Sequence, residues 1–343
     1  MEGAEFIQAV APGVTVADIN EPLYSPRVVQ SFFPFLGLHG VDAAAGAHPL
    51  LAAQVTELAD GVFVAMSLNH AIADGAAFWH LFNTWAEFRR ESDDAISSPL
   101  PVHRRWFADG FAVPVPLPFG KLEDIHVSTR TDGHPSSVHE ECILHFSAES
   151  VKKLKAKANA EMSGNGSGTT TNSSLQALLA HLWIAASRAR RLAPDQKDIV
   201  HPPSSDAGAN WMAYRLPTRA TRWHSSRRCP PSPEYQGQDA GVLKIHVLES
   251  WPKNPRFACM SSHPTATDTV VTGGSPRFDV YGNDFGWGQP VAVRTGPANK
   301  AEGSANVYEG RGGRGSITLE VCLAPDVLAR LVADEEFMSA ASA

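Results

Sequence analysis

The stretch Ser67-Leu68-Asn69-His70-Ala71-Ile72-Ala73-Asp74-Gly75 joins an apolar run to an amphipathic one. The run before it, residues 62–68, predicts a buried strand. After it, apolar residues recur at helical spacing: Phe78, Leu81, Phe82 and Trp85. Asp74 stands where a helix N-cap is expected, and Gly75 allows the chain to turn closely. His70, at the mouth of the strand, is placed to act as a base in a cleft. A lone histidine at a strand end is more often structural, so this stretch alone leaves both roles open.

Length and composition describe a globular chain of two domains. The sequence has 343 residues, of which 43% are hydrophobic and 19% are charged. The net charge of −7 and an isoelectric point near 6.0 argue against nucleic acid as a partner. The chain has no apolar run long enough to span a membrane and no signal-peptide pattern at its N-terminus. Its four cysteines are scattered without a CxxC pair. We therefore expect a cytoplasmic protein without a metal site or a disulfide framework.

The first hundred residues predict a small sheet followed by a helix. Residues 1–30 carry little pattern, whereas residues 51–56 alternate as in a half-buried strand. Ala59-Asp60-Gly61 predicts a hairpin turn, because Asp-Gly supports positive φ. The strand at 62–68 is apolar on both faces, so we expect it at the centre of its sheet. The helix is expected to run from Asp74 to about Arg90.

The middle of the chain changes character. Residues 98–135 are proline-rich with few periodic signals, and a connection of this length predicts a crossover between domains. A strand is expected at 140–146, followed by a lysine-rich helix from Ser147. The polar cluster that ends in Asn172-Ser173-Ser174 precedes a strongly apolar helix reaching Arg191. Its hydroxyls and free N–H groups suit either plain capping or an anion or amide-rich tail.

Strand-like patterns return after residue 270. Alternating or apolar runs predict four strands: 277–281, 291–294, 305–308 and 316–323. A tight aromatic turn, Gly282–Gly288, separates the first two. The last two predict a hairpin, so the Gly- and Arg-rich stretch Gly310–Gly315 is interpreted as its loop rather than as an RNA-binding element. Pro325 opens a final helix.

Two motifs, His70-Ala71-Ile72-Ala73-Asp74-Gly75 and Asp284-Phe285-Gly286-Trp287-Gly288, occur in this order. HxxxD alone is a weak signal, but the five-residue DFGWG motif is specific. Together they resemble the BAHD family of plant acyl-CoA-dependent acyltransferases. Further stretches extend the resemblance: Gln54–Leu58, His103–Phe107, Ser173–Ala177 and Ser275–Phe278. The resemblance implies an α/β fold of two chloramphenicol-acetyltransferase-like domains, each a mixed sheet flanked by helices, with a tunnel between them.

The resemblance also implies a reaction. An acyl-CoA and the hydroxyl or amine of a small plant metabolite would meet in the tunnel of a monomeric enzyme that binds no permanent cofactor. His70 would be the general base, because an imidazole can take a proton from a hydroxyl or amine at cellular pH. The acceptor atom would attack the thioester carbonyl, and CoA would leave as the thiol without a covalent acyl-enzyme.

The remaining motif residues are expected to shape the site. Asp74 would hold the loop that aims His70 and would pair with an arginine, for which Arg227 and Arg228 are candidates. The DFGWG residues Asp284–Gly288 would fix loop and domain geometry.

Two pairs of residues are expected to contact the substrates. Ser173 and Ser174 would lie along the pantetheine arm of the CoA. Ser275 and Arg277 would face the acceptor.

The chain also departs from the family pattern. The strand-helix-strand unit expected upstream of His70 does not appear, and residues 199–228 do not look like the expected central strand. We therefore predict an incomplete N-terminal domain in residues 1–97, a crossover at 98–135 and a C-terminal domain in 136–343. These departures leave two other functions open. One is a catalytically incompetent paralogue or binding protein on the same fold, and the other is a lyase that works without CoA.

Overall fold

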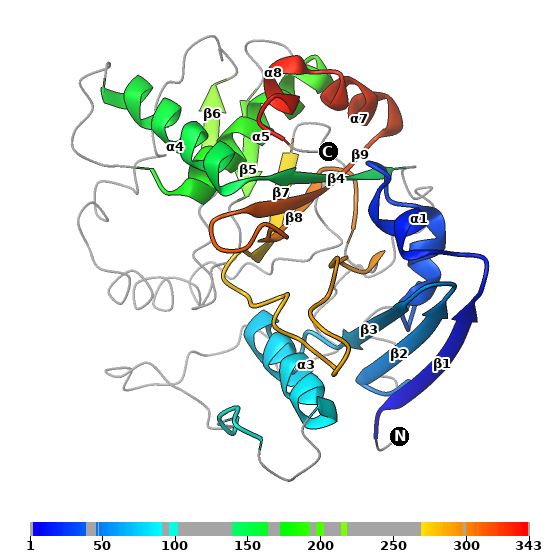
Figure 1. Cartoon of the computed structure of the whole chain (residues 1–343). Coiled ribbons are helices and arrows are strands. Elements are labelled where there is room, and N and C mark those ends of the chain that lie inside the picture. The colour runs from blue at the N-terminus through cyan, green and yellow to red at the C-terminus, as the bar shows by residue number, and fades with distance from the viewer. Residues whose placement is uncertain are drawn as a thin grey trace, which may run out of the picture.

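The computed structural model contains two β-sheets with helices packed on them (Figure 1). The structure describes residues 3–38, 46, 48–90, 96–101, 139–163, 172–192, 197–201, 214–217, 269–297 and 300–341. Each sheet contains both parallel and antiparallel strand pairs. The predicted α/β class with two mixed, helix-flanked sheets is therefore confirmed. Across the described ranges, no helix is both long and apolar enough to cross a membrane.

The first sheet has the order β1-β2-β3 among the described residues. Strand β1 (Glu5–Ala11) pairs in parallel with β2 (Leu51–Leu58), which pairs antiparallel with β3 (Val62–Leu68). The backbone N–H of Leu58 donates a 2.8 Å hydrogen bond to the carbonyl of Gly61. This bond closes the predicted Ala59-Asp60-Gly61 turn and confirms the hairpin.

The structure corrects the interpretation of residues 1–30. They form three elements, which are β1, helix α1 (Val16–Asn20) and the 3-10 helix η1 (Arg27–Phe32). β1 escapes detection because its apolar side chains are not buried. Phe6 and Val10 remain 64% and 68% exposed, so its sequence carries no burial pattern.

The expected central place of β3 is wrong, because β2 occupies the middle of the three described strands. β3 is apolar on both faces for another reason, which is that both faces are covered. The ring of Phe63 packs 5.3 Å from that of Phe32 in η1. On the opposite face, Met66 packs in a cluster with Phe82 of helix α3 (Gly75–Arg90).

Helix α3 confirms the helix predicted from Asp74 to Arg90. Glu87 on this helix is only 6% exposed and accepts hydrogen bonds from the N–H and hydroxyl groups of Ser97 and Ser98. These bonds fold the chain back onto α3 where the predicted 98–135 crossover begins. Beyond residue 101, that crossover lies outside the described residues.

The second sheet has the order β4-β9-β8-β7-β5-β6 in the described part of the chain. The bounds of its strands are β4 Glu140–Phe146, β5 Lys197–His201, β6 Tyr214–Pro217, β7 Thr269–Ser275, β8 Ser304–Glu309 and β9 Ile317–Leu323. β4 confirms the strand predicted at 140–146. The antiparallel pair of β8 and β9 confirms the predicted hairpin, with Gly310–Gly315 in its turn.

Two strand predictions in the C-terminal part are wrong. Residues 277–281 form a turn, because the side-chain amide of Asn283 donates a 2.8 Å hydrogen bond back to the carbonyl of Val280. Residues 291–294 form no strand, and the carbonyl of Val293 accepts instead from the hydroxyl of Tyr308, at 3.0 Å. Conversely, 199–228 does contain strand residues, the end of β5 and all of β6.

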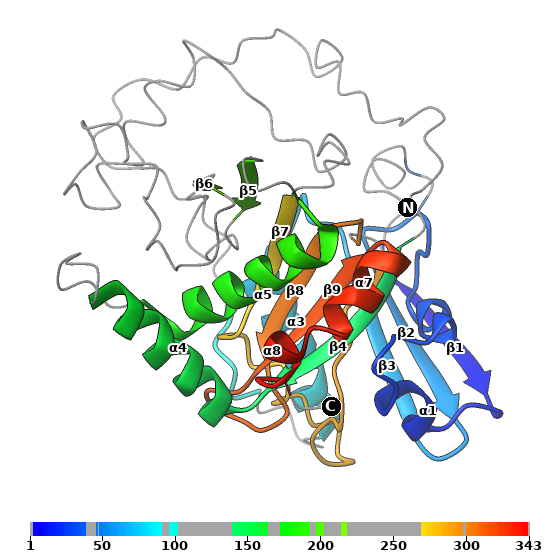
Figure 2. The ribbon, with the colours of Figure 1, turned by 90° about the horizontal axis from the view of Figure 1, so that it is seen from above.

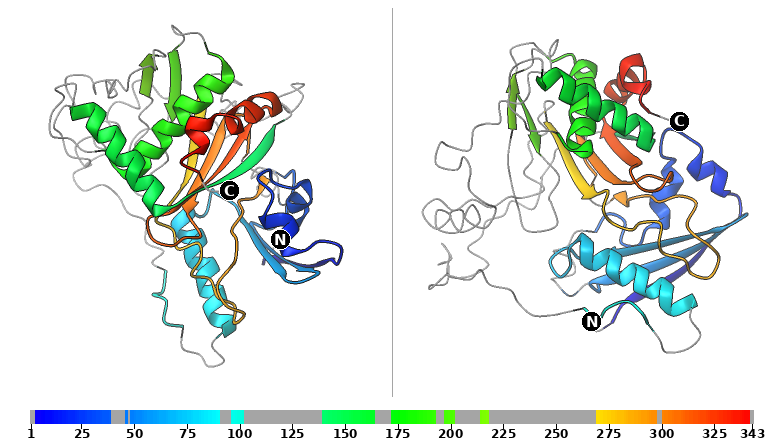
Figure 3. Two further views of the ribbon diagram at one scale, coloured as in Figure 1. Left: turned by 45° about the horizontal axis from the view of Figure 1, so that its top comes forward. Right: turned by 60° about the vertical axis from the view of Figure 1, so that its left-hand side comes forward.

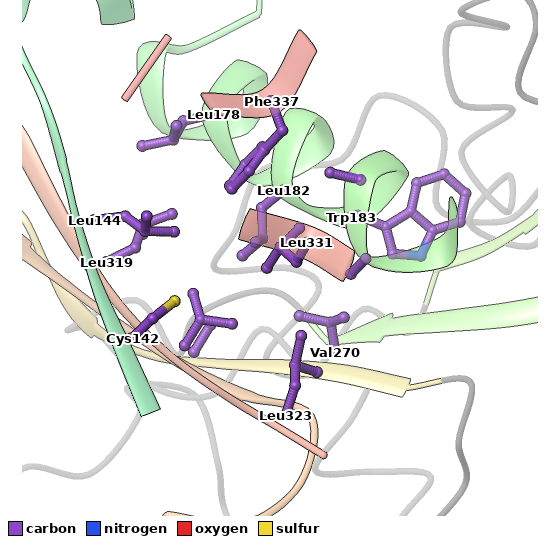
Figure 4. Close-up of a cluster of buried hydrophobic side chains, with 14 of the residues drawn as sticks. Cys142, Leu144, Leu178, Leu182, Trp183, Val270, Leu319, Leu323, Leu331 and Phe337 are labelled. Carbon is purple, nitrogen blue, oxygen red and sulfur yellow. The ribbon is translucent and has the colours of Figure 1, made fainter. Parts of the chain in front are cut away.

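Four helices cover one face of the second sheet (Figure 2). They are α4 Ala148–Ser163, α5 Ser174–Arg190, α7 Pro325–Val332 and α8 Glu335–Met338. In the core beneath them, side chains of α5 and α7 meet those of the strands, including Leu182, Leu331, Leu144 and Leu319 (Figure 4). These four leucines are fully buried, so this cluster is the main hydrophobic core of the second sheet.

The chain between β7 and β8 departs from the second sheet and returns to it. On the way it runs beside α3, which packs on the first sheet (Figure 3). This excursion, residues 276–303, contains the DFGWG motif and thereby brings it next to the helix that follows HxxxD.

Candidate active site

The loop that carries His70 is a tight turn at the end of β3. The backbone N–H of Asn69 donates to the carbonyl of Leu50 at 2.9 Å, which extends the β2–β3 pairing by one residue. The side-chain oxygen of Asn69 then accepts from the N–H of Ala71 at 2.9 Å, and the N–H of Ile72 donates to the carbonyl of Asn69 at 3.1 Å. The turn presents the His70 side chain on the surface of the described residues.

Asp74 caps the helix that follows, as its position in the sequence predicts. Its carboxylate accepts a 2.8 Å hydrogen bond from the N–H of Ala77, and its carbonyl accepts from Phe78 at 2.9 Å. An aspartate in this position satisfies an orphan donor of the first turn and favours the helix dipole. The two candidates for its arginine partner, Arg227 and Arg228, lie outside the described residues.

The DFGWG motif forms a turn organised by Asp284. One carboxylate oxygen accepts from the N–H of Gly286 at 2.7 Å and from that of Gly288 at 2.9 Å. These two bonds lower the pKa of Asp284, with the bond from Gly286 as the largest cause. Gly286 and Gly288 have φ values of 96° and 98°, which an L side chain rarely adopts. The motif thus requires these glycines for backbone reasons.

Phe285 anchors this turn on α3. Its side chain is 8% exposed, and its ring lies edge-on at 5.0 Å from Trp85 and 5.7 Å from Phe82. Trp287, by contrast, is 65% exposed. The HxxxD and DFGWG motifs therefore meet on one helix, the first at its N-terminus and the second on its aromatic face.

Ser173 and Ser174 lie at the start of α5, in the second part of the chain. Ser173 forms a complete capping box, because its hydroxyl accepts from the N–H of Gln176 and its own N–H donates to the Gln176 side chain. The capping interpretation of this cluster is therefore confirmed. Contact with a pantetheine arm stays a prediction.

Ser275 and Arg277 flank the point where the excursion leaves the sheet. Ser275 is the last residue of β7, paired with Tyr308 of β8. Arg277 follows in an exposed turn. Their role on the acceptor side stays a prediction.

A buried polar network was missed by the sequence interpretation. Glu320 on β9 is fully buried and accepts hydrogen bonds from the N–H and hydroxyl of Thr295 and, at 2.9 Å, from the hydroxyl of Tyr308. The ammonium of Lys300 lies 3.1 Å from Glu320 and 2.5 Å from Glu141 of β4. Burial lowers the pKa of Lys300, but the two carboxylates outweigh this effect and raise it.

This network ties the excursion to the sheet and, through Arg294, to the first half of the chain. The guanidinium of Arg294 donates to the carbonyl of Ile19 at 3.2 Å and to the side-chain oxygen of Asn20 at 3.3 Å. Both acceptors lie at the end of α1, where free carbonyls favour a cation. No local pattern signals the network, because alternate polar residues on β9 resemble a solvent-facing edge.

We expect Glu141 to make stability fall as pH rises toward neutrality. Burial and the neighbouring Glu320 raise the pKa of Glu141 from 4.5 to about 7, against the opposing effect of Lys300. A pKa raised by folding stabilises the protein fully below the unfolded value, and this contribution is lost as pH rises through the folded value. Between about pH 4.5 and 8, the free energy of unfolding of the wild type should therefore fall by roughly 1–3 kcal/mol relative to Glu141→Gln.

Urea unfolding of both proteins across this pH range measures the difference. Glu149→Gln is the matched control, since Glu149 is 75% exposed and forms its ion pair with Lys153 at the surface. Its difference from the wild type should stay constant above about pH 5.5. A wild type that gains stability relative to Glu141→Gln as pH rises would contradict the expectation.

Two hollows open on the α3 side of the first sheet. They measure about 420 Å³ and 270 Å³, and Trp287 lines both. Neither is lined by His70 or by the residues expected to contact CoA.

Comparison with known proteins identifies the family of the chain. The family model described as "Transferase family" matches residues 1–201 and 234–338. An uncharacterized acetyltransferase of Arabidopsis thaliana is 32% identical, over 98% of this chain and 77% of the relative. The BAHD acyltransferase DCR of the same plant is 28% identical, over 98% of this chain and 72% of the relative.

Solved structures share the fold. TRI101 of F. graminearum, in complex with coenzyme A and T-2 mycotoxin, superposes with a TM-score of 0.65 at 14% identity, over 99% of this chain and 81% of TRI101. Vinorine synthase gives 0.53 at 17% identity, over 85% of this chain and 66% of that chain. The family model and the sequence relatives define the class of protein as an acyltransferase. The chain belongs to the Transferase family, the BAHD acyltransferases.

Proposed function

We propose that the protein transfers the acyl group of an acyl-CoA to the hydroxyl or amine of a small plant metabolite, with His70 as the general base. The observation that carries this proposal is the position of His70. It lies exposed in the turn between β3 and α3, in a loop held at both ends by Asn69 and Asp74.

The chemistry follows from this position. The imidazole of His70 takes the proton of the acceptor hydroxyl or amine, and the acceptor atom attacks the thioester carbonyl. A tetrahedral oxyanion forms and collapses, the carbon–sulfur bond breaks, and CoA leaves as the thiol with the proton returned by His70. Asp74 acts as a brace, since its carboxylate is engaged with the amide of Ala77. Asp284 likewise holds its own turn.

The names of the relatives support an acyl-CoA as co-substrate. A protein of Avena sativa, 24% identical over 94% of this chain, is a hydroxycinnamoyl-CoA:5-hydroxyanthranilate N-hydroxycinnamoyltransferase. We infer the same donor class for this chain, with no permanently bound cofactor and with Ser173 and Ser174 along the pantetheine arm. Ser275 and Arg277 would serve the acceptor side. The monomeric state, the cytoplasmic location, the domain boundaries and an incomplete first domain stay predictions.

The test is an assay of CoA release. Purified protein is incubated with acetyl-, malonyl- or hydroxycinnamoyl-CoA and a panel of phenols and amines, and free thiol is followed against a heat-denatured control. We expect acceptor-dependent thiol release with at least one donor. We also expect CoA to raise the temperature of unfolding, since a ligand that binds only the folded state stabilises it.

Each outcome has a distinct meaning. Unfolding that shifts with CoA, without thiol release for any pair, would favour the non-catalytic binding protein. Absence of both effects would exclude acyl transfer from these donors.

A further inference from the structure

The ring of Phe278 packs directly on Gly75, the first residue of α3. A methyl group placed on Gly75 would come within 2.7 Å of Cζ and 2.9 Å of Cε2 of that ring, closer than carbon atoms approach in folded proteins. The sequence places a glycine where the ring leaves no room for a side chain. Gly75 follows directly on Asp74, which ends the loop that carries His70.

This contact is the first of several that the excursion makes along α3. Just over two turns further along α3, the side-chain amide of Asn83 donates a 3.2 Å hydrogen bond to the carbonyl of Asp279, the residue after Phe278. Beyond it, Phe285 packs between Phe82 and Trp85. The excursion therefore lies against α3 from the N-terminus of the helix to its aromatic face (Figure 3).

The segment that presents Phe278 is held in shape. The N–H of Val280 donates to the carbonyl of Phe278 at 2.9 Å, and the carbonyl of Val280 accepts from Asn283 at 2.8 Å. Val280 itself is fully buried. These bonds fix the backbone that carries the ring, so we expect part of any change at the contact to be absorbed by the His70 loop or by α3.

We propose that Phe278 is a positioning residue, whose ring, through Gly75, sets the conformation of the loop from His70 to Asp74. This inference rests on the proposed function, in which His70 must reach the acceptor proton. The other end of the loop is tied through the N–H of Asn69 to the carbonyl of Leu50, beside β2, so a shift of α3 at Gly75 acts on the loop through Asp74. A displacement there moves His70 relative to both substrates.

The experiment compares Gly75→Ala with the double variant Gly75→Ala/Phe278→Leu. The added methyl group collides with the ring, so Gly75→Ala should lower kcat roughly 10- to 100-fold with little change in KM. Leucine removes the far edge of the ring, so the double variant should recover kcat to near that of Phe278→Leu alone. The matched control is Phe88→Leu in the Gly75→Ala background, which should restore nothing, because Phe88 on the same helix is 64% exposed.

A readout without turnover separates this inference from the proposed function. The ring signals of His70, identified in ¹⁵N-histidine-labelled protein by their loss in His70→Gln, should shift in Gly75→Ala and return in the double variant. A wild type without turnover would refute the proposed function, and the His70 signals would then decide the inference alone. Unchanged His70 signals, wild-type kcat in Gly75→Ala, or a double variant no better than Gly75→Ala would each overturn the positioning role.

Discussion

Replacing His70 by alanine is expected to lower kcat/KM for acyl transfer roughly 10²- to 10⁴-fold, the usual contribution of a general base. The loop around it keeps its shape, because the hydrogen bonds of the turn run through Asn69, Ala71 and Ile72 and not through the His70 side chain. The loss should therefore appear in kcat, while binding of CoA persists. Thiol release under saturating donor, together with the thermal shift caused by CoA, measures both quantities.

His80→Ala is the matched control. His80 lies ten residues further on, within α3, and has no part in the proposed reaction. It should retain activity close to the wild type. Equal activity in His70→Ala and His80→Ala would show that His70 is not the general base. Loss of the CoA-dependent thermal shift in His70→Ala would instead indicate a role of His70 in binding CoA.

Replacing Lys300 by methionine is expected to reduce the free energy of unfolding by roughly 3–5 kcal/mol, as when a buried ion pair loses one partner. The ammonium of Lys300 is 5% exposed and lies between the carboxylates of Glu141 and Glu320, which are 13% and 0% exposed. Methionine fills a similar volume but leaves both carboxylates without this cation. Denaturant unfolding at neutral pH measures the loss.

Lys157→Met provides the comparison for this change. Lys157 forms an ion pair with Glu336 at 3.0 Å, but both side chains are about half exposed, and such pairs contribute about 0–1 kcal/mol. If Lys300→Met were no more destabilising than Lys157→Met, the buried network would contribute little to stability. Adding Glu141→Gln to Lys300→Met should change the free energy of unfolding much less than Lys300→Met itself. Without Lys300 the raised pKa of Glu141 rises further, so this carboxyl is mostly protonated at neutral pH.

The elements that the sequence predicts well are those whose pattern reflects local burial. Helix α5 and strand β9 are apolar at the spacing that their core requires, and the β2–β3 hairpin is specified by its Asp-Gly turn. Strand β1 is not predicted, because its partner strand β2 lies 47 residues further along the chain and its own apolar side chains stay exposed. Residues 277–281 are wrongly predicted as a strand for the opposite reason. Phe278 and Val280 alternate with polar residues, but their apolar side chains make their contacts from a turn.

The candidate site likewise contains features that local sequence predicts and features that only the fold creates. The capping role of Asp74 and the turn-forming role of DFGWG depend on neighbours within four residues, so spacing is enough to predict them. The Glu320 network depends on Thr295, Lys300 and Glu141, which only the fold brings together. The packing of Phe278 on Gly75 joins residues about two hundred positions apart, and no single-sequence pattern records such a contact.

The position of Phe285 also bears on the order in which the chain acquires its structure during synthesis. The first sheet and α3 leave the ribosome well before residue 285, so the aromatic face formed by Phe82 and Trp85 stays open until most of the chain has been translated. Only then can the late-arriving ring close it. The hydrophobic cluster between the first sheet and α3 is thus completed only after residue 285 has been translated, although the sheet itself is encoded early.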